Sequence, residues 1–300
     1  MLIEMQSGLS PSHLTYKRWE TGIIGDITLD DRGHAAIDFI KRSCDTVYTL
    51  KYDPRSLKIR LNEIEVSVDD IESVIKDFCK GSLILETTTL RADEILLSCK
   101  AVQQIGASSI SLLYIEPQSY NRFRQSEVLH RRDFDLSTEY EPFAGIPGSI
   151  LMLNASRRTK AVFLVGYEGQ RLKTALDRTD IKPENSYIIF GVPAFQPGWE
   201  MDAFANNIRV IRDEDIANNV LFGGAQNPVS VFEAIEQVHK SLVSNEQLVV
   251  IPIGTKPHGI GAVLFACKYD DVGVIYDHPN RKHGRSSQVG TWHLFNVTFG

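Results

Sequence analysis

The sequence predicts an α/β protein in which helices cover both faces of a mostly parallel sheet. The first observation is a series of short apolar runs without polar alternation, which is typical of strands buried on both faces. The second is their order, because these runs alternate with segments of helical periodicity. The third is the composition of the 300 residues, with 43% hydrophobic and 23% charged, as in folded globular proteins. We therefore expect a Rossmann-like fold, with two tandem Rossmann-like halves as one arrangement that fits the length.

Charge and cysteine content narrow the class of protein. The chain has 32 Lys and Arg against 38 Asp and Glu, a net charge of −6, which argues against an extended nucleic-acid-binding surface. No apolar run reaches the roughly 18 residues that span a bilayer, and the start lacks the apolar region of a secretory signal. The 4 cysteines are widely spaced, as expected for buried thiols in a reducing compartment. We expect a cytoplasmic protein with no membrane partner, no metal site and no cofactor.

Residues 1–117 are expected to form an N-terminal α/β half. Two segments that alternate on either side of Asp53-Pro54 predict a hairpin. Ser67 is expected to cap a helix, because acidic residues follow in its first turn and apolar residues then recur at helical spacing. A strand–helix–strand unit completes this half. The expected strands are 22–29, 46–52, 57–61, 82–86 and 109–115, and the expected helices are 34–43, one after Ser67, and 92–105.

Residues 118–148 interrupt this rhythm with a basic stretch, an acidic stretch and a Pro/Gly turn. A connection of this length without a periodic element is unusual inside a compact domain. One interpretation is an irregular surface insertion. The other is a mobile lid, or an arm that binds a protein partner.

Residues 149–300 are expected to form a C-terminal Rossmann-like half, in which the α/β alternation resumes. Strands are predicted where the runs are apolar and β-branched, and helices where apolar residues recur every three or four positions. The expected strands are 161–165, 186–192, 209–211, 247–253, 272–276 and an edge strand at 292–297; the expected helices are 168–176, 200–208, 229–243 and one that follows residue 254 and runs through Cys267.

The turn after residues 247–253 is the strongest candidate for a ligand site. Ligands of open parallel sheets bind at the carboxyl ends of the strands. Gly254 allows a sharp turn, Thr255 or Lys256 can cap the helix, and Pro257 suits its start. The helix N-terminus and the Lys256 charge together favour an anion, with His258 close by. The alternative is tight packing of helix on strand with a surface lysine.

Three further turns carry polar residues after predicted strands. Gly166, Glu168 and Arg171 offer a flexible turn, an acceptor and a cationic fork that suit a ribose or a phosphate, or else form an ordinary first helical turn. Asp277 beside His278 suits acid–base chemistry, or else belongs to a solvated basic loop. The third turn supplies a carboxylate and hydroxyl groups that could equally be plain helix caps; it contains Glu86, Thr87 and Thr88.

If one parallel sheet runs through the protein, these turns should meet at one edge. We expect the Cα atoms of Thr87, Gly166 and Gly254 to lie within roughly 20 Å of one another, about four strand spacings. Lys256 and Arg171 would then face one concavity of mixed charge. Such a site suits a ligand with both phosphate and hydroxyl groups.

The strand–Gly254-Thr255-Lys256–helix turn resembles the Gly-Thr-Lys turn of the CRISPR-associated Rossmann-fold sensors. Members of that family bind cyclic oligonucleotides at a dimer interface. The resemblance implies that Thr255 and Lys256 contact a ligand, and it is compatible with a homo-oligomer.

Three functional hypotheses follow from the sequence. The first is a ligand sensor or binding subunit for a nucleotide or sugar phosphate. The second is an enzyme of the nucleosidase, hydrolase or transferase type, with Glu86, Glu168 or Asp277 as the catalytic carboxylate. The third is a scaffold subunit whose protein partner binds residues 118–148.

Overall fold

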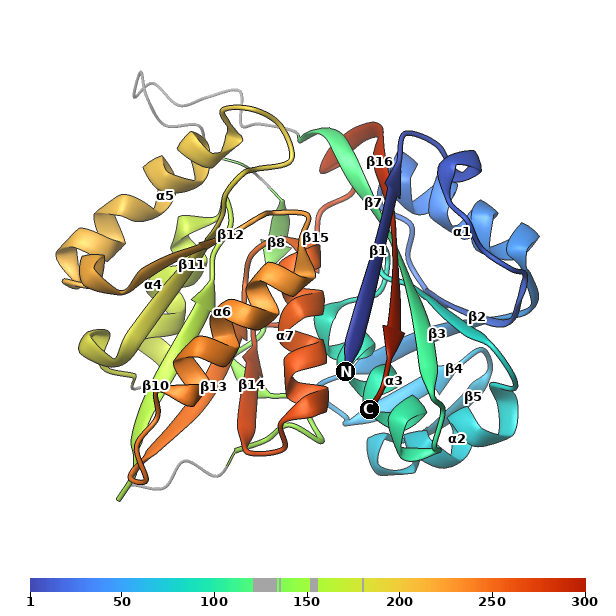
Figure 1. Ribbon diagram of the computed structural model, residues 1–300, viewed down its shortest axis with the longest axis horizontal. Coiled ribbons are helices and arrows are strands. Elements are labelled where there is room, and N and C mark those ends of the chain that lie inside the picture. The colour runs from blue at the N-terminus through green and yellow to red at the C-terminus, as the bar shows by residue number, and fades with distance from the viewer. Residues whose placement is uncertain (121–133, 135, 152–155, 180) are drawn as a thin grey trace. The chain divides into compact units, whose positions relative to one another are not determined.

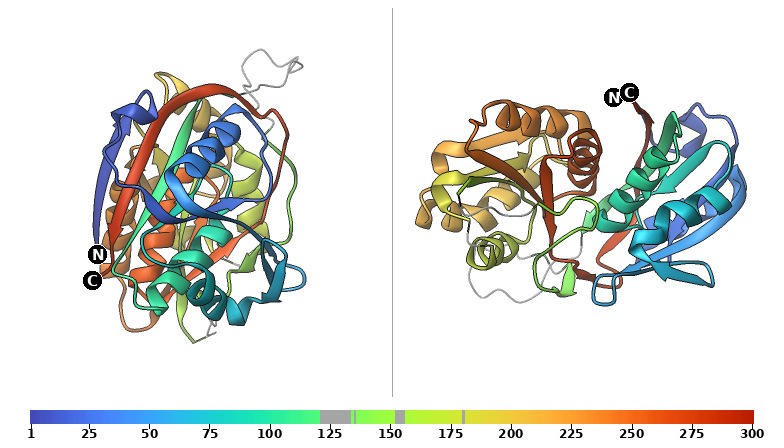
Figure 2. Two further views of the ribbon diagram at one scale, coloured as in Figure 1. Left: turned by 90° about the vertical axis from the view of Figure 1, so that its right-hand side faces the viewer. Right: turned by 90° about the horizontal axis from the view of Figure 1, so that it is seen from below.

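The computed structural model describes residues 1–120, 134, 136–151, 156–179 and 181–300, and it is an α/β protein (Figures 1 and 2). The chain divides into two compact units. Unit 1 consists of residues 1–120 and 282–300, and unit 2 of residues 121–281. Unit 2 is therefore inserted within the chain of unit 1. The expected C-terminal half, 149–300, needs correction, because its last segment belongs to unit 1.

Unit 1 contains an eight-stranded sheet of order β1-β16-β7-β6-β2-β3-β4-β5. The central strands β7, β6, β2 and β3 are parallel, and antiparallel strands extend the sheet on both sides. The predicted hairpin and βαβ unit are both present. The strands are β1 (Leu2–Gly8), β2 (Trp19–Gly25), β3 (Cys44–Asp53), β4 (Lys58–Leu61), β5 (Ile64–Ser67), β6 (Leu83–Glu86), β7 (Ser109–Tyr120) and β16 (Ser286–Thr298).

Three helices cover this sheet: α1 (Asp31–Ser43), α2 (Ile71–Phe78) and α3 (Ala92–Gln104). Asp30 caps α1 by accepting a hydrogen bond from the Gly33 amide at 3.1 Å. The inner face of α1 packs into a core cluster, where the Phe39 ring meets Trp292 edge-on at 5.6 Å. Burying an aromatic side chain of this size contributes roughly 1.5–3 kcal/mol. The core thus joins α1 to the last strand of the chain.

β16 is an interior strand, whereas the sequence predicts an edge strand at 292–297. It lies between β1 and β7, and Leu294, Phe295 and Val297 are fully buried. The first strand, β1, was not predicted, because none of its residues is fully buried and their exposure does not alternate regularly. β7 continues past Pro117, whose partner Val289 lies where the pairing register is irregular. A missing ladder donor is tolerated at such a position.

Unit 2 contains a six-stranded sheet of order β12-β11-β10-β13-β14-β9, in which the first five strands are parallel. A separate two-stranded ladder joins β8 to β15. The strands are β8 (Ser137–Glu139), β9 (Ala144–Gly145), β10 (Arg158–Leu164), β11 (Ser186–Gly191), β12 (Val220–Gly223), β13 (Glu246–Pro252), β14 (Val272–Tyr276) and β15 (Asn280–Arg281).

The helices of unit 2 are α4 (Gly169–Arg178), α5 (Trp199–Asp213), α6 (Pro228–Lys240) and α7 (Lys256–Lys268). α4 packs with α5 and α6 with α7, and the two pairs cover opposite faces of the sheet (Figure 2). Right-handed crossovers that run in opposite directions from β10 require this arrangement. The strand predicted at 209–211 is wrong, because these residues continue the helical periodicity of α5. The strand of this region is β12.

The strand order of unit 2 reverses between β10 and β13, where Gly166 and Gly254 follow the two strands. A Cβ atom built on Gly166 would lie 3.2 Å from the Gly254 Cα, and one on Gly254 would lie 2.7 Å from the Val165 carbonyl oxygen. A side chain at Gly254 would therefore displace the neighbouring backbone, and one at Gly166 would fit only if that backbone moved by a few tenths of an ångström. Thr87 follows β6 in the sheet of unit 1, so the expectation of a single sheet edge for all three turns is wrong.

All four cysteines are free and buried, as predicted. Within the described residues, no helix has the length and apolar character that a bilayer crossing requires.

Candidate functional site

Three of the four predicted turns lie at the carboxyl edge of the sheet in unit 2. They follow β10, β13 and β14, and contribute Glu168 and Arg171, the first turn of α7, and Asp277, respectively. We call this group, together with Tyr140, the carboxyl-edge site. Because β10 and β13 flank the point where the strand order reverses, this is where an open parallel sheet binds its ligands.

Arg171 and Asp277 form a buried, two-pronged ion pair. The Arg171 Nε and Nη2 atoms donate to the two Asp277 oxygens at 2.8 and 2.6 Å, and Nη1 donates to the Ile253 carbonyl at 2.9 Å. Burial by itself would lower the pKa of Arg171, but the charge of Asp277 and the hydrogen bonds to it raise that pKa above its ordinary value. The pair ties the start of α4 to the ends of β13 and β14. Arg171 and Asp277 thus have a structural role. Arg171 was a candidate for phosphate binding and Asp277 for general-base chemistry, but their polar groups bond to each other and to the Ile253 carbonyl instead.

Glu168 is the carboxylate of the site that receives hydroxyl groups. Its Oε1 accepts from the Tyr140 hydroxyl at 2.9 Å, and its Oε2 accepts from the Ser137 hydroxyl at 3.4 Å. Oε2 also lies 3.6 Å from the Arg171 Nη1 atom, and the Tyr140 ring centroid lies 5.6 Å from the Arg171 guanidinium carbon. Glu168 is therefore held by two hydroxyl groups and lies beside the positive charge of Arg171.

Tyr140 and Ser137 belong to the segment predicted as an insertion, 118–148. Its residues 121–133 and 135 lie outside the described residues, so the interpretation as a lid or partner arm is not tested there. The part from 136 to 141, which we call the strap, is built into unit 2. β8 pairs with β15, and the Glu141 amide donates to the Asp277 carbonyl at 3.0 Å. No local pattern in the sequence indicates that Tyr140 reaches the site.

The first turn of α7 has the predicted cap. The Thr255 hydroxyl accepts from the His258 amide at 3.4 Å and donates to the Ala225 carbonyl at 2.9 Å. Lys256 is the first helical residue and is half-buried. The helix N-terminus and this ammonium group place positive charge next to the β13 end.

His258 and His278 are buried rather than presented to solvent. The His258 Nε2 atom lies 3.1 Å from the Gly224 carbonyl oxygen and 3.3 Å from that of Gly223, which assigns the ring proton to Nε2. Burial lowers the pKa of His258 to about 4, although these hydrogen bonds act in the opposite direction. Its ring is therefore neutral at pH 7 and anchors the β12–α6 loop. His278 is 2% exposed and meets the Tyr276 ring edge-on at 5.2 Å.

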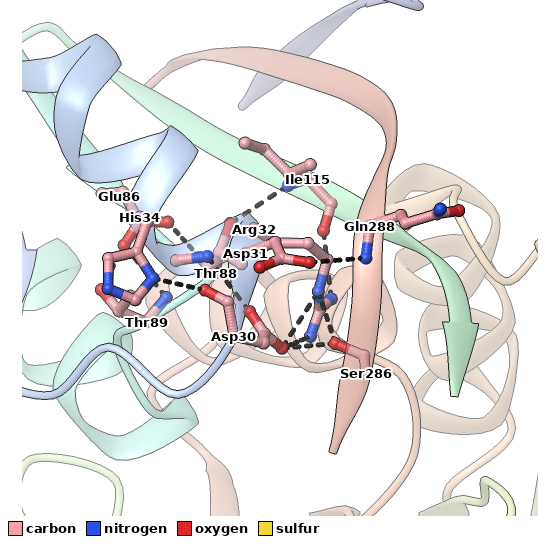
Figure 3. A network of polar contacts seen from close by, with 11 residues as sticks. Asp30, Asp31, Arg32, His34, Glu86, Thr88, Thr89, Ile115, Ser286 and Gln288 are labelled. Carbon is pink, nitrogen blue, oxygen red and sulfur yellow. Dashed lines mark hydrogen bonds and ion pairs between the residues drawn. The ribbon is translucent and has the colours of Figure 1, made fainter. Parts of the chain in front are cut away.

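The fourth turn, in unit 1, is closed by its own hydrogen bonds (Figure 3). The buried Glu86 carboxylate accepts from the Thr88 and Thr89 amides at 2.6 and 3.0 Å, and also from the Thr89 hydroxyl. The Thr87 hydroxyl donates to the Leu113 carbonyl at 2.6 Å, and the Thr88 hydroxyl accepts from the Ile115 amide at 3.1 Å. Burial raises the pKa of Glu86 despite these bonds. The turn is therefore structural, but its hydroxyl groups are not the helix caps that the sequence suggested, because Arg91 is the N-cap residue of α3.

A buried arginine network beside this turn was missed by the sequence analysis (Figure 3). Arg32 donates to Asp30 at 2.7 Å, to the Ser286 hydroxyl at 3.0 Å and to the Ile115 carbonyl at 3.2 Å. The Ser286 hydroxyl also donates to Asp30. Burial opposes the charged form of Asp30, but Arg32 and the hydrogen bonds hold its pKa below the ordinary value. The network joins α1, β7 and β16, and its partners Ile115 and Ser286 are too far from Arg32 in sequence to be recognised locally.

Among the described residues, no group of three or more His, Cys, Asp or Glu side chains could hold a metal ion. A scan against protein-family models finds no match, and a search of curated proteins finds no significant match.

Proposed function

We propose that the chain binds a nucleotide or a phosphorylated sugar at the carboxyl-edge site of a Rossmann-like unit 2. The observation that supports this most directly is a pair of complementary groups at the point of strand-order reversal. The positive first turn of α7 lies on one side, and the Glu168 carboxylate on the other. A single Arg171 nitrogen, Nη1, contacts both Glu168 and the Ile253 carbonyl that precedes the α7 turn.

The two sides suit different parts of one ligand. A phosphate would lie at the α7 N-terminus and Lys256, where the helix dipole and the ammonium group favour an anion. Sugar hydroxyls would donate to Glu168. A ligand that combines both groups fits better than a bare polyanion, because Glu168 would repel the latter. The resemblance of the Gly254-Thr255-Lys256 turn to CRISPR-associated sensors points to the same turn as the ligand contact.

A binding or sensing role is favoured over catalysis by the state of the carboxylates. Two of the three candidate bases, Glu86 and Asp277, are buried and fully engaged by hydrogen bonds within the protein. A general base must reach a substrate proton. Glu168 also accepts hydrogen bonds within the protein, but its side chain is partly exposed and its hydrogen-bond partners are hydroxyl groups.

Isothermal titration calorimetry with inorganic phosphate, ribose 5-phosphate and AMP tests the proposal. We expect binding of at least one of these compounds, and an affinity about tenfold lower in Lys256→Ala, as for the loss of a charge-assisted hydrogen bond. The matched control is Lys182→Ala, which removes an exposed lysine that precedes β11 at the opposite edge of the sheet. Absence of binding, or equal losses in the two variants, would contradict the proposal.

A further inference from the structure

Each oxygen of the Glu168 carboxylate accepts a hydrogen bond from a hydroxyl group of the strap. Tyr140 supplies one at 2.9 Å and Ser137 the other at 3.4 Å. A carboxylate has two acceptor oxygens side by side, so a pair of neighbouring hydroxyl groups satisfies it in the same way. The two strap hydroxyls therefore reproduce the hydrogen bonds of a vicinal diol.

The position of Glu168 makes this arrangement relevant to binding. Glu168 precedes α4 at the end of β10, and its side chain is 11% exposed. Tyr140, which covers it, is 39% exposed. The strap is not part of the parallel sheet; it is joined through the short β8–β15 ladder and the Glu141–Asp277 backbone bond. Its contact with Glu168 thus rests on two hydroxyl groups and on the Tyr140 ring over Arg171.

We infer that Glu168 binds the vicinal diol of a sugar, and that the Tyr140 and Ser137 hydroxyls occupy the diol positions when no ligand is present. This inference rests on the proposed function and specifies its ligand as one with an intact ribose-type diol. Binding exchanges two internal hydroxyl–carboxylate bonds for two bonds to the ligand. No covalent step is involved.

If a ligand diol replaces the strap hydroxyls, substitutions of Tyr140 and Glu168 should have opposite effects on diol binding. Tyr140→Phe removes one competing hydroxyl but retains the ring over Arg171, so a diol ligand should bind several-fold more tightly. Glu168→Ala removes the acceptor, so the preference for a diol should disappear. Matched controls in unit 2 are Tyr187→Phe on β11 and Glu184→Ala, an exposed glutamate that precedes the same strand.

The experiment measures calorimetric affinities of the full chain for adenosine, 2′-deoxyadenosine, AMP and 2′-deoxy-AMP, with inorganic phosphate as the probe without a sugar. We expect the ribose compounds to bind about tenfold more tightly than their deoxy analogues, as one hydrogen bond to a charged group implies. This ratio should fall to about one in Glu168→Ala and stay unchanged in Glu184→Ala.

The outcomes separate this inference from the proposed function. Equal binding of AMP and 2′-deoxy-AMP, with loss of both in Lys256→Ala, would overturn the diol site and leave the proposed function standing. Glu168-dependent binding of adenosine that is unaffected by Lys256→Ala would support the diol site and remove the anion end of the proposal. Weaker diol binding in Tyr140→Phe would overturn the exchange, because Tyr140 would then be a ligand contact. Absence of binding by every probe would refute both.

Discussion

Replacing Asp277 by Asn should selectively destabilise unit 2. The substitution keeps the size of the side chain but removes the charge that compensates Arg171. The side chains of Arg171 and Asp277 are 8% and 1% exposed, so water cannot replace the lost partner. Glu168 remains, but its Oε2 atom is 3.6 Å from the nearest guanidinium nitrogen. Breaking a buried pair in this way costs about 3–5 kcal/mol.

Hydrogen–deuterium exchange at increasing urea concentration measures this cost for each unit separately. Peptides from β10 and β13 should show a fall of about 3 kcal/mol or more in the free energy of opening, while peptides from β3 and β7 stay unchanged. The double variant Arg171→Met/Asp277→Leu should recover much of the loss, because apolar replacement removes both buried charges. The matched control is Asp213→Asn, which removes the acidic partner of two exposed ion pairs on α5 and should leave exchange nearly unaffected. A loss below about 1 kcal/mol in Asp277→Asn would refute the assignment of the pair as the structural link of this edge.

Three further substitutions test other parts of the structure. The pKa of His258 is about 4 in the folded protein and about 6.5 in the unfolded chain, so unit 2 should lose up to about 3 kcal/mol of stability as the pH falls through that interval. His258→Gln should reduce this pH dependence in denaturation curves recorded between pH 4 and 7. Glu86→Ala leaves the buried Thr88 and Thr89 amides without their acceptor and should lower the unfolding free energy of unit 1 by about 1–3 kcal/mol in the same exchange assay, whereas an unchanged value would show that another group replaces the carboxylate. Gly254→Ala places a methyl group 2.7 Å from the Val165 carbonyl oxygen and should lower the thermal midpoint of unit 2 by calorimetry; a neutral result would mean that β10 and β13 separate easily.

Local signals in the sequence predicted the elements well, because they depend on neighbouring residues. The apolar run 247–253 and the cap at Thr255 correspond to β13 and the start of α7. The segment 209–211 failed because three residues can fit either a strand or the end of a helix, and the rest of α5 decides between them. Which strands share a sheet was not predictable, since β7 pairs with β16 across more than 150 residues of chain.

The candidate site was predicted in position but not in its internal contacts. Glu168 and the α7 turn were located by the rule that ligands bind at strand ends. Asp277, the partner of Arg171, lies 106 residues away in the sequence. The sequence alone therefore could not show that Arg171 pairs with a protein carboxylate and not with a phosphate. Tyr140 belongs to a segment without periodicity, and no local pattern links it to Glu168. The contacts that were not predicted are therefore those between side chains that meet only through tertiary structure.

The place of β16 in the sheet sets the order in which a growing chain can complete its two units. In the described structure β1 pairs only with β16, and β16 is also the partner that covers the outer side of β7. Until the ribosome has made residues 286–298, both strands expose unsatisfied ladder groups and an apolar edge, a hazard for aggregation. Unit 2, whose strands all precede residue 282, can be complete before then. The topology therefore allows the inserted unit to finish before unit 1, whose sheet can close only after β16 has been made.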